Sequence, residues 1–335
     1  MKALVQNFPH ASLSLVERDV PIPGLGQIRI RVEACGVCHS DLALQEGEFP
    51  FAHFPVVPGH EVAGVVDAVG EGVSWPQVGD RVGMPWLYSA CLHCKQCAHG
   101  DEVMCAEGQV TGVTVDGGYQ EYLIAPALFA APIPDALDFA DAAPLMCAGI
   151  TVFNGLRNAG FQPGDKVAVI GLGGLGHLGV MFACAMGAEV AVVSSSASKE
   201  ELAYQLGAAK FINSKSTDLT QALWAWGGAD IVLATAPAVE PMQAAIGGLA
   251  PDGTLVIVGA AGGELKVAPM DLILGRRHIM GSPSGSRKDI RDTLEFAAAH
   301  GIRPQLTRFP LAEAQEALDE MKAGKLIGRA VLTVG

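Results

Sequence analysis

One glycine-rich segment constrains the fold more than any other part of the sequence. Gly171-Leu172-Gly173-Gly174-Leu175-Gly176 follows an apolar stretch, Lys166–Ile170, and leads into a helical run, Leu175–Met186. Such a loop between a strand and a helix allows a tight turn and lets a pyrophosphate approach the backbone N–H groups at the helix N-terminus. The segment predicts a dinucleotide-binding domain, with cofactor contacts at Gly171, Gly173, Gly174, Leu175 and Gly176. An ordinary glycine-rich turn is the alternative.

The segments after this loop support the same fold class. Apolar, β-branched stretches recur at Glu189–Val193, Lys210–Asn213, Asp230–Ala234 and Thr254–Gly259, with helix-like stretches between them. Buried strands that alternate with helices predict a doubly wound parallel sheet. We therefore expect a Rossmann domain over residues 151–284.

The first 150 residues have a different pattern. Gln27–Glu33 alternates polar and apolar residues with period two, and Val62–Val66 and Asp80–Gly83 continue in the same style between Pro and Gly. This pattern is typical of half-buried strands. Two helical stretches and a last strand, Gly328–Leu332, follow residue 284 and are expected to return to this β-rich domain, because chain termini often lie close together.

Composition and charge exclude several classes of function. The 335 residues are 50% hydrophobic and 17% charged, which excludes a largely disordered chain. The formal net charge of −13 disfavours binding to nucleic acid and to anionic membrane surfaces. The start of the chain reaches Gln6 and Asn7 too soon for a signal peptide, and the uncharged stretch Val167–Ala188 contains six glycines. We expect a cytoplasmic protein and no membrane span.

Four cysteines lie close together with metal-ligand spacing: Cys91, Cys94, Cys97 and Cys105. Four thiolates can surround one tetrahedral Zn²⁺ and leave no open position, which is the pattern of a structural zinc site. An iron–sulfur cluster prefers a shorter last gap followed by Pro, and a disulfide framework is not expected in a chain of this size without an export signal. We predict a structural zinc lobe at about residues 88–108, against the alternative of uninvolved buried cysteines.

A second possible metal set is dispersed along the chain. Cys38, His60 and Cys147 together offer two thiolates and one imidazole, and they leave a fourth position open, as catalytic zinc requires. Spacing alone does not identify this set. Taken singly, Cys147 is typical of a buried core cysteine and His60 of a hydrogen-bonded structural histidine.

The end of the second Rossmann strand indicates which dinucleotide binds. An acidic residue at this point binds the ribose hydroxyls of NAD. Here the chain has Ser194, Ser195 and, close behind, Lys199 in place of a carboxylate. These residues favour NADP over NAD. A serine that only caps a helix would fit either cofactor, and Glu200 and Glu201 oppose the binding of a 2′-phosphate.

Together these segments resemble the zinc-dependent medium-chain alcohol dehydrogenases over nearly the whole chain. The matching segments are Gly36–Asp41, Pro58–Glu61, the four-cysteine lobe, Met146–Thr151, the glycine loop with His177, and Gly328-Arg329. The serines resemble those of the NADP-using cinnamyl-type and aldehyde-reducing branch. The resemblance implies an α/β protein with a GroES-like catalytic domain (residues 1–150 and 285–335) and a Rossmann domain (residues 151–284).

The resemblance also implies roles for single residues. Cys38, His60 and Cys147 would bind a catalytic Zn²⁺, the second zinc ion of each chain, and Glu61 would be a carboxylate that can ligate it transiently. Asp41 would accept a hydrogen bond from His60, and Ser40 would take the proton of the alcohol. The remaining implied contacts are His39 and Arg329 with the pyrophosphate, Thr151 with the nicotinamide, Val258 with the cofactor, and Phe49 and Trp86 with the substrate.

The implied activity is reversible hydride transfer between a primary alcohol or its aldehyde, aliphatic or aromatic, and NAD(P). Many members carry a proton-relay histidine where this chain has Ala43, so the proton would leave by water and the ribose hydroxyl or by another base such as His53. A polyol dehydrogenase, which expects a more polar pocket, is one alternative. Another is a nonenzymatic zinc- and dinucleotide-binding protein of the same fold. We expect a homodimer or homotetramer, for which residues 277–283 could supply an edge strand.

Overall fold

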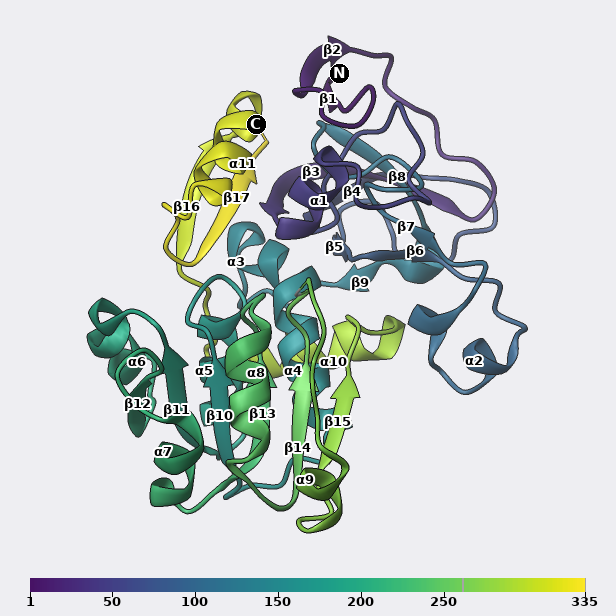
Figure 1. Cartoon of the computed structure of the whole chain (residues 1–335). Helices are drawn as coiled ribbons and strands as arrows, with labels where there is room; N and C mark the ends of the chain where they lie inside the picture. The colour runs from purple at the N-terminus through teal and green to yellow at the C-terminus, as the bar shows by residue number, and fades with distance from the viewer. Residues whose placement is uncertain (261, 335) are drawn as a thin grey trace. The chain divides into compact units, whose positions relative to one another are not determined.

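The computed structural model describes residues 1–260 and 262–334 of the chain. They form two compact units, Met1–Ile150 with Gly285–Gly335, and Thr151–Ser284. Figure 1 shows a β-rich first unit and a second unit in which strands and helices alternate. This arrangement confirms the α/β class and the Rossmann-type sheet.

The first unit is built on a sheet with the order β16-β17-β3-β4-β5-β9, and β8 pairs with β3. In β3 (Gln27–Val37) alternate residues are buried as far as Val32, which confirms the strand predicted from the period-two pattern. The last strand, β17, pairs antiparallel with β3, so the C-terminal segment completes this sheet. The other strands are β4 (Val62–Val69), β5 (Arg81–Met84), β8 (Tyr122–Pro126), β9 (Ala131–Pro132), β16 (Leu306–Pro310) and β17 (Arg329–Thr333), with the pairs β1 (Lys2–Val5) and β2 (Ser14–Glu17), and β6 (Leu87–Ser89) and β7 (Gln109–Val110).

Short helices join and flank these strands. α1 (His39–Gln45) begins directly after β3, and its N-cap, Cys38, is closed by a capping box with Asp41. The others are α2 (Lys95–Ala98), η1 (Glu102–Met104), η2 (Ala127–Phe129), α3 (Phe139–Pro144), the π-helical turn η3 (Leu145–Gly149), α10 (Arg287–Ala299), η5 (Leu311–Glu313) and α11 (Ala314–Lys322).

The second unit contains a six-stranded parallel sheet with the order β12-β11-β10-β13-β14-β15. Numbered along the unit this order is 3-2-1-4-5-6, the doubly wound topology. The strands are β10 (Lys166–Ile170), β11 (Glu189–Ser194), β12 (Lys210–Asn213), β13 (Ala229–Ala234), β14 (Leu249–Ile257) and β15 (His278–Gly281); the helices are α4 (Ile150–Asn158), α5 (Gly176–Ala185), η4 (Ala197–Lys199), α6 (Glu200–Gln205), α7 (Leu219–Trp226), α8 (Val239–Ile246) and α9 (Pro269–Ile273).

Both faces of this sheet are covered, which explains why its strands have near-continuous apolar sequences. Residues of α7 and α8 pack with Ala168 and Val232 in one core cluster. On the opposite face of the sheet, glycines of α4 and α5 allow these helices to lie close to the strands. A Cβ at Gly179 of α5, for example, would lie 3.0 Å from the side chain of Leu233. Because successive side chains of a strand point to opposite faces of the sheet, each strand packs against helices on both sides.

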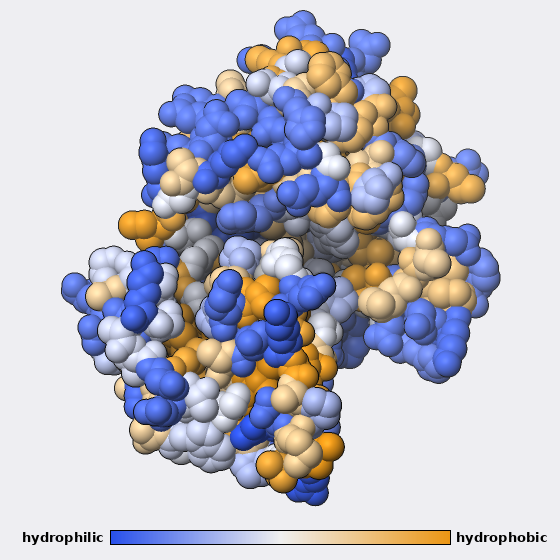
Figure 2. Space-filling view, viewed as in Figure 1, coloured by the Kyte–Doolittle hydropathy of each residue, from blue (hydrophilic) through white to orange (hydrophobic). Residues whose placement is uncertain are grey.

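Long apolar stretches of the chain are buried in these units. The predicted strand, turn and helix in Val167–Ala188 are observed as β10 and α5. The continuous helical stretch Phe139–Asn158 is long and apolar enough to span a membrane, but 83% of its most apolar window is buried inside the protein. Such burial is typical of a core helix. Figure 2 shows apolar side chains on the surface of the second unit around α9, where Met270, Ile273 and Leu274 are exposed.

Candidate metal and cofactor sites

Four side chains of the first unit bring possible metal ligands together. Cys38, His60, Glu61 and Cys147 each offer one ligand atom, and these atoms all lie within 4.8 Å of one another. Cys38 caps α1 at the end of β3, His60 and Glu61 immediately precede β4, and Cys147 lies on the turn η3. Strand pairing between β3 and β4 therefore joins two of the three segments.

The geometry of this group fits a zinc ion. The Sγ atoms of Cys38 and Cys147 are 3.9 Å apart. Two sulfurs on a tetrahedral Zn²⁺ at about 2.3 Å are separated by about 3.8 Å, whereas a disulfide requires about 2.05 Å. His60 is fully buried, and neither ring nitrogen has a hydrogen-bond partner among the residues that the structure describes. Because an unpaired buried nitrogen is costly, a metal ligated by His60 would satisfy it.

Asp41 organises the segments that carry these ligands. Its Oδ2 accepts hydrogen bonds from the Cys38 backbone N–H at 2.9 Å and from the Tyr119 hydroxyl at 3.2 Å. Its Oδ1 accepts from the backbone N–H of Gly59, the residue before His60, at 3.1 Å. His60 Nδ1 lies 3.3 Å from the same oxygen but outside hydrogen-bond geometry, so the contact between the two side chains is electrostatic.

Charges around the cluster favour a thiolate at Cys38. The hydrogen bond with Cys147 lowers the pKa of the Cys38 thiol well below its usual range. Burial of the thiol opposes this shift, and His60 adds to it. Burial disfavours a charged His60, yet the Asp41 carboxylate raises the pKa of this imidazole well above its usual value. The thiolate is the form of cysteine that ligates a metal.

Glu61 has a partner that the sequence did not reveal. Arg329 Nη2 donates to Glu61 Oε1, and both side chains are buried. Arg329 was predicted to contact a pyrophosphate, and in the structure it is only 5% exposed and paired with Glu61. Burial raises the pKa of Glu61 to about 8, although the positive charge of Arg329 acts in the opposite direction. His39, the other predicted pyrophosphate contact, is exposed at the first position of α1.

Aromatic side chains line one side of the cluster. The rings of Trp86 and His60 meet edge to face with centroids 5.0 Å apart, and Phe49 lies 6.0 Å from Trp86 in a similar arrangement. Phe49 and Trp86 pack in a small apolar cluster with Leu44. Ser40 is partly exposed, with its Oγ 3.8 Å from Cys38 Sγ. The two predicted substrate-pocket residues and Ser40 therefore lie near the possible metal ligands.

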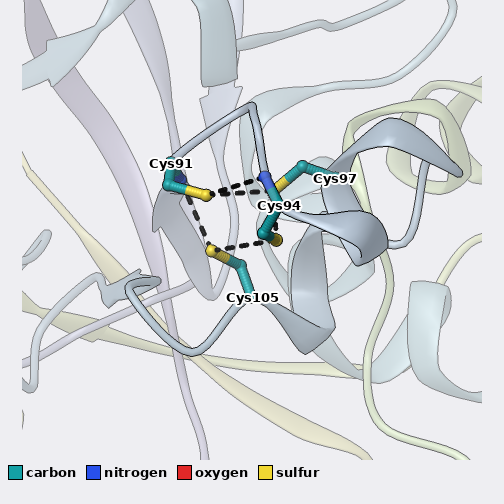
Figure 3. Close-up of side chains that lie close together, drawn as sticks. All are labelled: Cys91, Cys94, Cys97 and Cys105. Carbon is teal, nitrogen blue, oxygen red and sulfur yellow. Dashed lines mark hydrogen bonds between the residues drawn. The ribbon is translucent and has the colours of Figure 1, made fainter.

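Figure 3 shows the four-cysteine lobe, in which Cys91, Cys94, Cys97 and Cys105 point their sulfurs toward one another. Sγ–Sγ distances are 3.5 Å for Cys94 and Cys97, 3.9 Å for Cys91 and Cys97, and 4.0 Å for Cys94 and Cys105. These distances fit the edges of a ZnS₄ tetrahedron and are too long for disulfides. The backbone N–H groups of Cys91 and Cys94 also point at cluster sulfurs, at 3.4 and 3.3 Å.

The lobe is tied to α10 by contacts that sequence reasoning missed. Glu102 is 4% exposed, and its Oε1 accepts hydrogen bonds from Arg287 Nε and Nη2 at 2.9 and 2.6 Å. The Val103 backbone N–H donates to Ser286 Oγ at 3.2 Å. The partners are separated by more than 180 residues, so no local pattern indicates their pairing.

The glycine loop of the second unit has the conformation that its sequence predicted. Gly171 has φ +93°, a region that favours glycine. A Cβ at Gly176 would lie 2.0 Å from the Gly171 carbonyl oxygen, so the helix can approach the strand only with glycine there. Gly173 is exposed, and a Cβ added to it would meet nothing within 4 Å. Gly174 and Leu175 lead from it into α5, so the loop backbone is open to a ligand.

Most of the other predicted cofactor residues of this unit follow the carboxyl ends of its strands, and Thr151 lies on a helix. Ser194 ends β11 and is buried, while Ser195 is exposed. Lys199 Nζ donates to the Leu172 carbonyl oxygen at 2.9 Å, which places its charge beside the glycine loop. Val258 directly follows β14, and Thr151 lies on α4.

Comparisons with known proteins identify relatives along the whole chain. Residues 24–135 match the alcohol dehydrogenase GroES-like domain, and residues 174–299 match the zinc-binding dehydrogenase domain. An alcohol dehydrogenase of Moraxella sp. is 41% identical over 99% of both chains. The aldehyde reductase AdhA of Synechocystis sp. is 36% identical over 99% of this chain and 98% of its own.

Solved structures give the same result. A cinnamyl alcohol dehydrogenase from Sorghum bicolor superposes with a TM-score of 0.91 at 33% identity, over 99% of this chain and 97% of its own. CAD from Helicobacter pylori, complexed with NADP(H), has a TM-score of 0.88 at 27% identity and 99% coverage of both chains. Acetophenone reductase from Geotrichum candidum, in complex with NAD, has a TM-score of 0.87 at 29% identity, over 99% and 96%.

Proposed function

The chain belongs to the zinc-binding medium-chain alcohol dehydrogenases and is an oxidoreductase that acts on small alcohols, and from this premise we propose that it is a zinc-dependent, NADP-preferring aldehyde reductase and primary-alcohol dehydrogenase. The observation that carries the proposal is the buried set of Cys38, His60 and Cys147. It combines sulfurs at the spacing of zinc ligands with a buried imidazole that has no hydrogen-bond partner among the described residues.

We propose two zinc ions per chain. Cys38, His60 and Cys147 would hold the catalytic ion with Glu61 in reach, and Cys91, Cys94, Cys97 and Cys105 would hold the structural ion. When bound at the first site, zinc supplies Lewis acidity, which lowers the pKa of an alcohol and polarises an aldehyde carbonyl. Asp41 keeps this ligand set in place, because it holds the backbone at both Cys38 and Gly59.

Ser40 is proposed to exchange the substrate proton. Its hydroxyl lies beside Cys38, on the first turn of α1, and can accept a proton from a substrate hydroxyl or return it to a carbonyl oxygen. The onward route does not use the usual histidine, since position 43 is Ala. His53 is exposed and its Nδ1 lies 3.0 Å from the Thr114 carbonyl oxygen, so we assign the next transfer to His53 or to water.

The cofactor preference rests on the end of β11. Ser195 and Lys199 present a hydroxyl and an ammonium group where NAD-binding domains have a carboxylate. The solved relatives include one complexed with NADP(H) and one with NAD, so fold alone does not decide the preference. We assign NADP because no carboxylate follows Ser194 until Glu200. His39, Arg329, Thr151 and Val258 are proposed as further cofactor contacts.

Substrate class and assembly complete the proposal. The rings of Phe49 and Trp86 give the site an apolar aromatic side, which suits aliphatic and aromatic primary alcohols and their aldehydes better than polyols. The edge strand β15 and the exposed apolar residues of α9 support a homodimer or a homotetramer formed through this edge.

The test compares Cys147→Ala with Cys184→Ala, a control in which a partly buried thiol on α5 is removed. We expect Cys147→Ala to lose aldehyde reduction and one of two zinc ions while it still binds NADPH, and Cys184→Ala to keep all three properties. Reduction of an aldehyde panel with NADPH and NADH in parallel tests the cofactor. Turnover retained in Cys147→Ala would refute the catalytic zinc site, and a preference for NADH would refute only the cofactor assignment.

A further inference from the structure

We infer that Arg329 is a positioning residue that holds the Glu61 carboxylate away from the catalytic metal, in a space that only glycine at position 36 leaves open. This inference rests on the proposed function, because it concerns the metal held by Cys38, His60 and Cys147. It assigns Arg329 a task that is separate from any contact with a cofactor.

The pair is joined at one point only. Arg329 Nη2 donates to Glu61 Oε1, whereas Arg329 Nε and Glu61 Oε2 are buried and have no hydrogen-bond partner among the described residues. A guanidinium and a carboxylate commonly form two parallel hydrogen bonds. Here Glu61 keeps one oxygen on the arginine and a second oxygen without a partner.

The sheet of the first unit explains why the two residues meet. Ala330 of β17 pairs with Val37 of β3, so Arg329 lies beside the end of β3, where Cys38 follows. On the other side of β3, Glu61 directly precedes β4, and its carbonyl oxygen accepts a hydrogen bond from the Gly36 N–H at 2.9 Å. Strand register thus brings the guanidinium, the carboxylate and the thiol of Cys38 to the same place.

Gly36 provides the space for the carboxylate. A Cβ at position 36 would lie 1.8 Å from Glu61 Oε2 and 2.8 Å from its Cδ, far inside van der Waals contact. The glycine has an ordinary β conformation within β3, since it is absent from the residues with positive φ. The requirement for glycine here is therefore space for Glu61 and not backbone freedom.

Two positive groups can pair with this one carboxylate: the guanidinium of Arg329 and the metal, since an oxygen of Glu61 lies within 4.8 Å of the ligand atoms of Cys38, His60 and Cys147. A buried carboxylate without a countercharge is strongly disfavoured. Removal of Arg329 would leave the metal as a countercharge within reach of Glu61. Because ligation to a metal favours the deprotonated form of a carboxyl group, we expect Glu61 to become an additional ligand. Arg329 thereby keeps a coordination position open for substrate.

The experiment uses protein with Co²⁺ at the catalytic site and Zn²⁺ in the four-cysteine lobe, because ligand-field bands of Co²⁺ weaken and shift when a further ligand is added. The Cys147→Ala variant provides the baseline. We expect Arg329→Met to show a weaker, shifted band relative to the wild type. The double variant Arg329→Met/Glu61→Gln should regain the wild-type band, because an amide is a poor ligand. Lys322→Met, which removes an exposed cation paired with Glu46, is the matched control and should leave the band unchanged.

Gly36→Ala gives a second test that leaves both charges in place. The new methyl group should displace the carboxylate and change the band in the same direction, and Glu61→Gln should cancel this change. An unchanged spectrum in both Arg329→Met and Gly36→Ala, or a change that persists with Glu61→Gln, would overturn the inference. A wild type without a cobalt–thiolate band that depends on Cys147 would instead overturn the proposed metal site and this inference with it.

Discussion

Asp41→Asn tests whether Asp41 supports the proposed metal ligands or only stabilises the fold. The asparagine has nearly the same shape, but it replaces one acceptor oxygen with an N–H₂ group. In one orientation this group faces the Cys38 N–H, and in the other it faces the Gly59 N–H. One backbone N–H group, that of Cys38 or that of Gly59 beside His60, is therefore left without an acceptor in either case.

The structure sets the expected magnitudes. Asp41 is 3% exposed, so the donor left unpaired in its surroundings costs about 1–3 kcal/mol of unfolding free energy. Loss of a supporting contact to a metal ligand typically lowers metal affinity about 10–100-fold, or about 1.4–2.7 kcal/mol. Tyr119→Phe is the control, because it removes only one hydrogen bond to Asp41 and leaves the Cys38 N–H on the same oxygen. It should cost about 1 kcal/mol in stability and leave zinc affinity nearly unchanged.

The assay measures zinc content by atomic emission after dialysis against graded concentrations of a chelator. Asp41→Asn should lose one of two zinc ions at a chelator concentration about 10–100-fold below that needed for the wild type. Tyr119→Phe should follow the wild type. If Asp41→Asn keeps both ions as firmly as the wild type while its stability falls, Asp41 is a structural residue and our account of its role is wrong.

Three further predictions concern other parts of the chain. Glu102→Gln should lower the free energy of unfolding by about 1–2 kcal/mol, since it weakens a pair with the half-exposed Arg287, and folded protein should keep its turnover; denaturant titration and kinetics test this. Ser195→Asp should raise the KM for NADPH roughly tenfold or more relative to NADH. Burial raises the pKa of Tyr88 from 10 to about 12. The neutral Tyr88 phenol therefore contributes to stability below pH 10, and this contribution is lost as the pH rises through 12. Over this pH range the unfolding free energy of Tyr88→Phe should fall less than that of the wild type.

Features that depend on neighbouring residues were predictable from the sequence. The glycine loop lies between the predicted strand Lys166–Ile170 and a helix, because glycines at fixed offsets are needed for that turn. The four-cysteine lobe follows from its short spacing, which brings the sulfurs together whatever surrounds them. The strands that were predicted differ from the observed ones at their ends, as in β14, which begins at Leu249 and not at Thr254, because strand ends depend on pairing with neighbours.

Features formed by residues far apart in the sequence could not be predicted from any local pattern. Cys38, His60 and Cys147 carry no common spacing, and only the resemblance to a family suggested that they belong together. The pair of Glu61 and Arg329 spans 268 positions and was not predicted at all. The strands of the second unit, the glycine turn and the cysteine lobe could be derived from the sequence, because they depend on local backbone preferences and short loops. Which charges meet at the proposed metal site depends on strand register and burial, which no local pattern of the sequence contains.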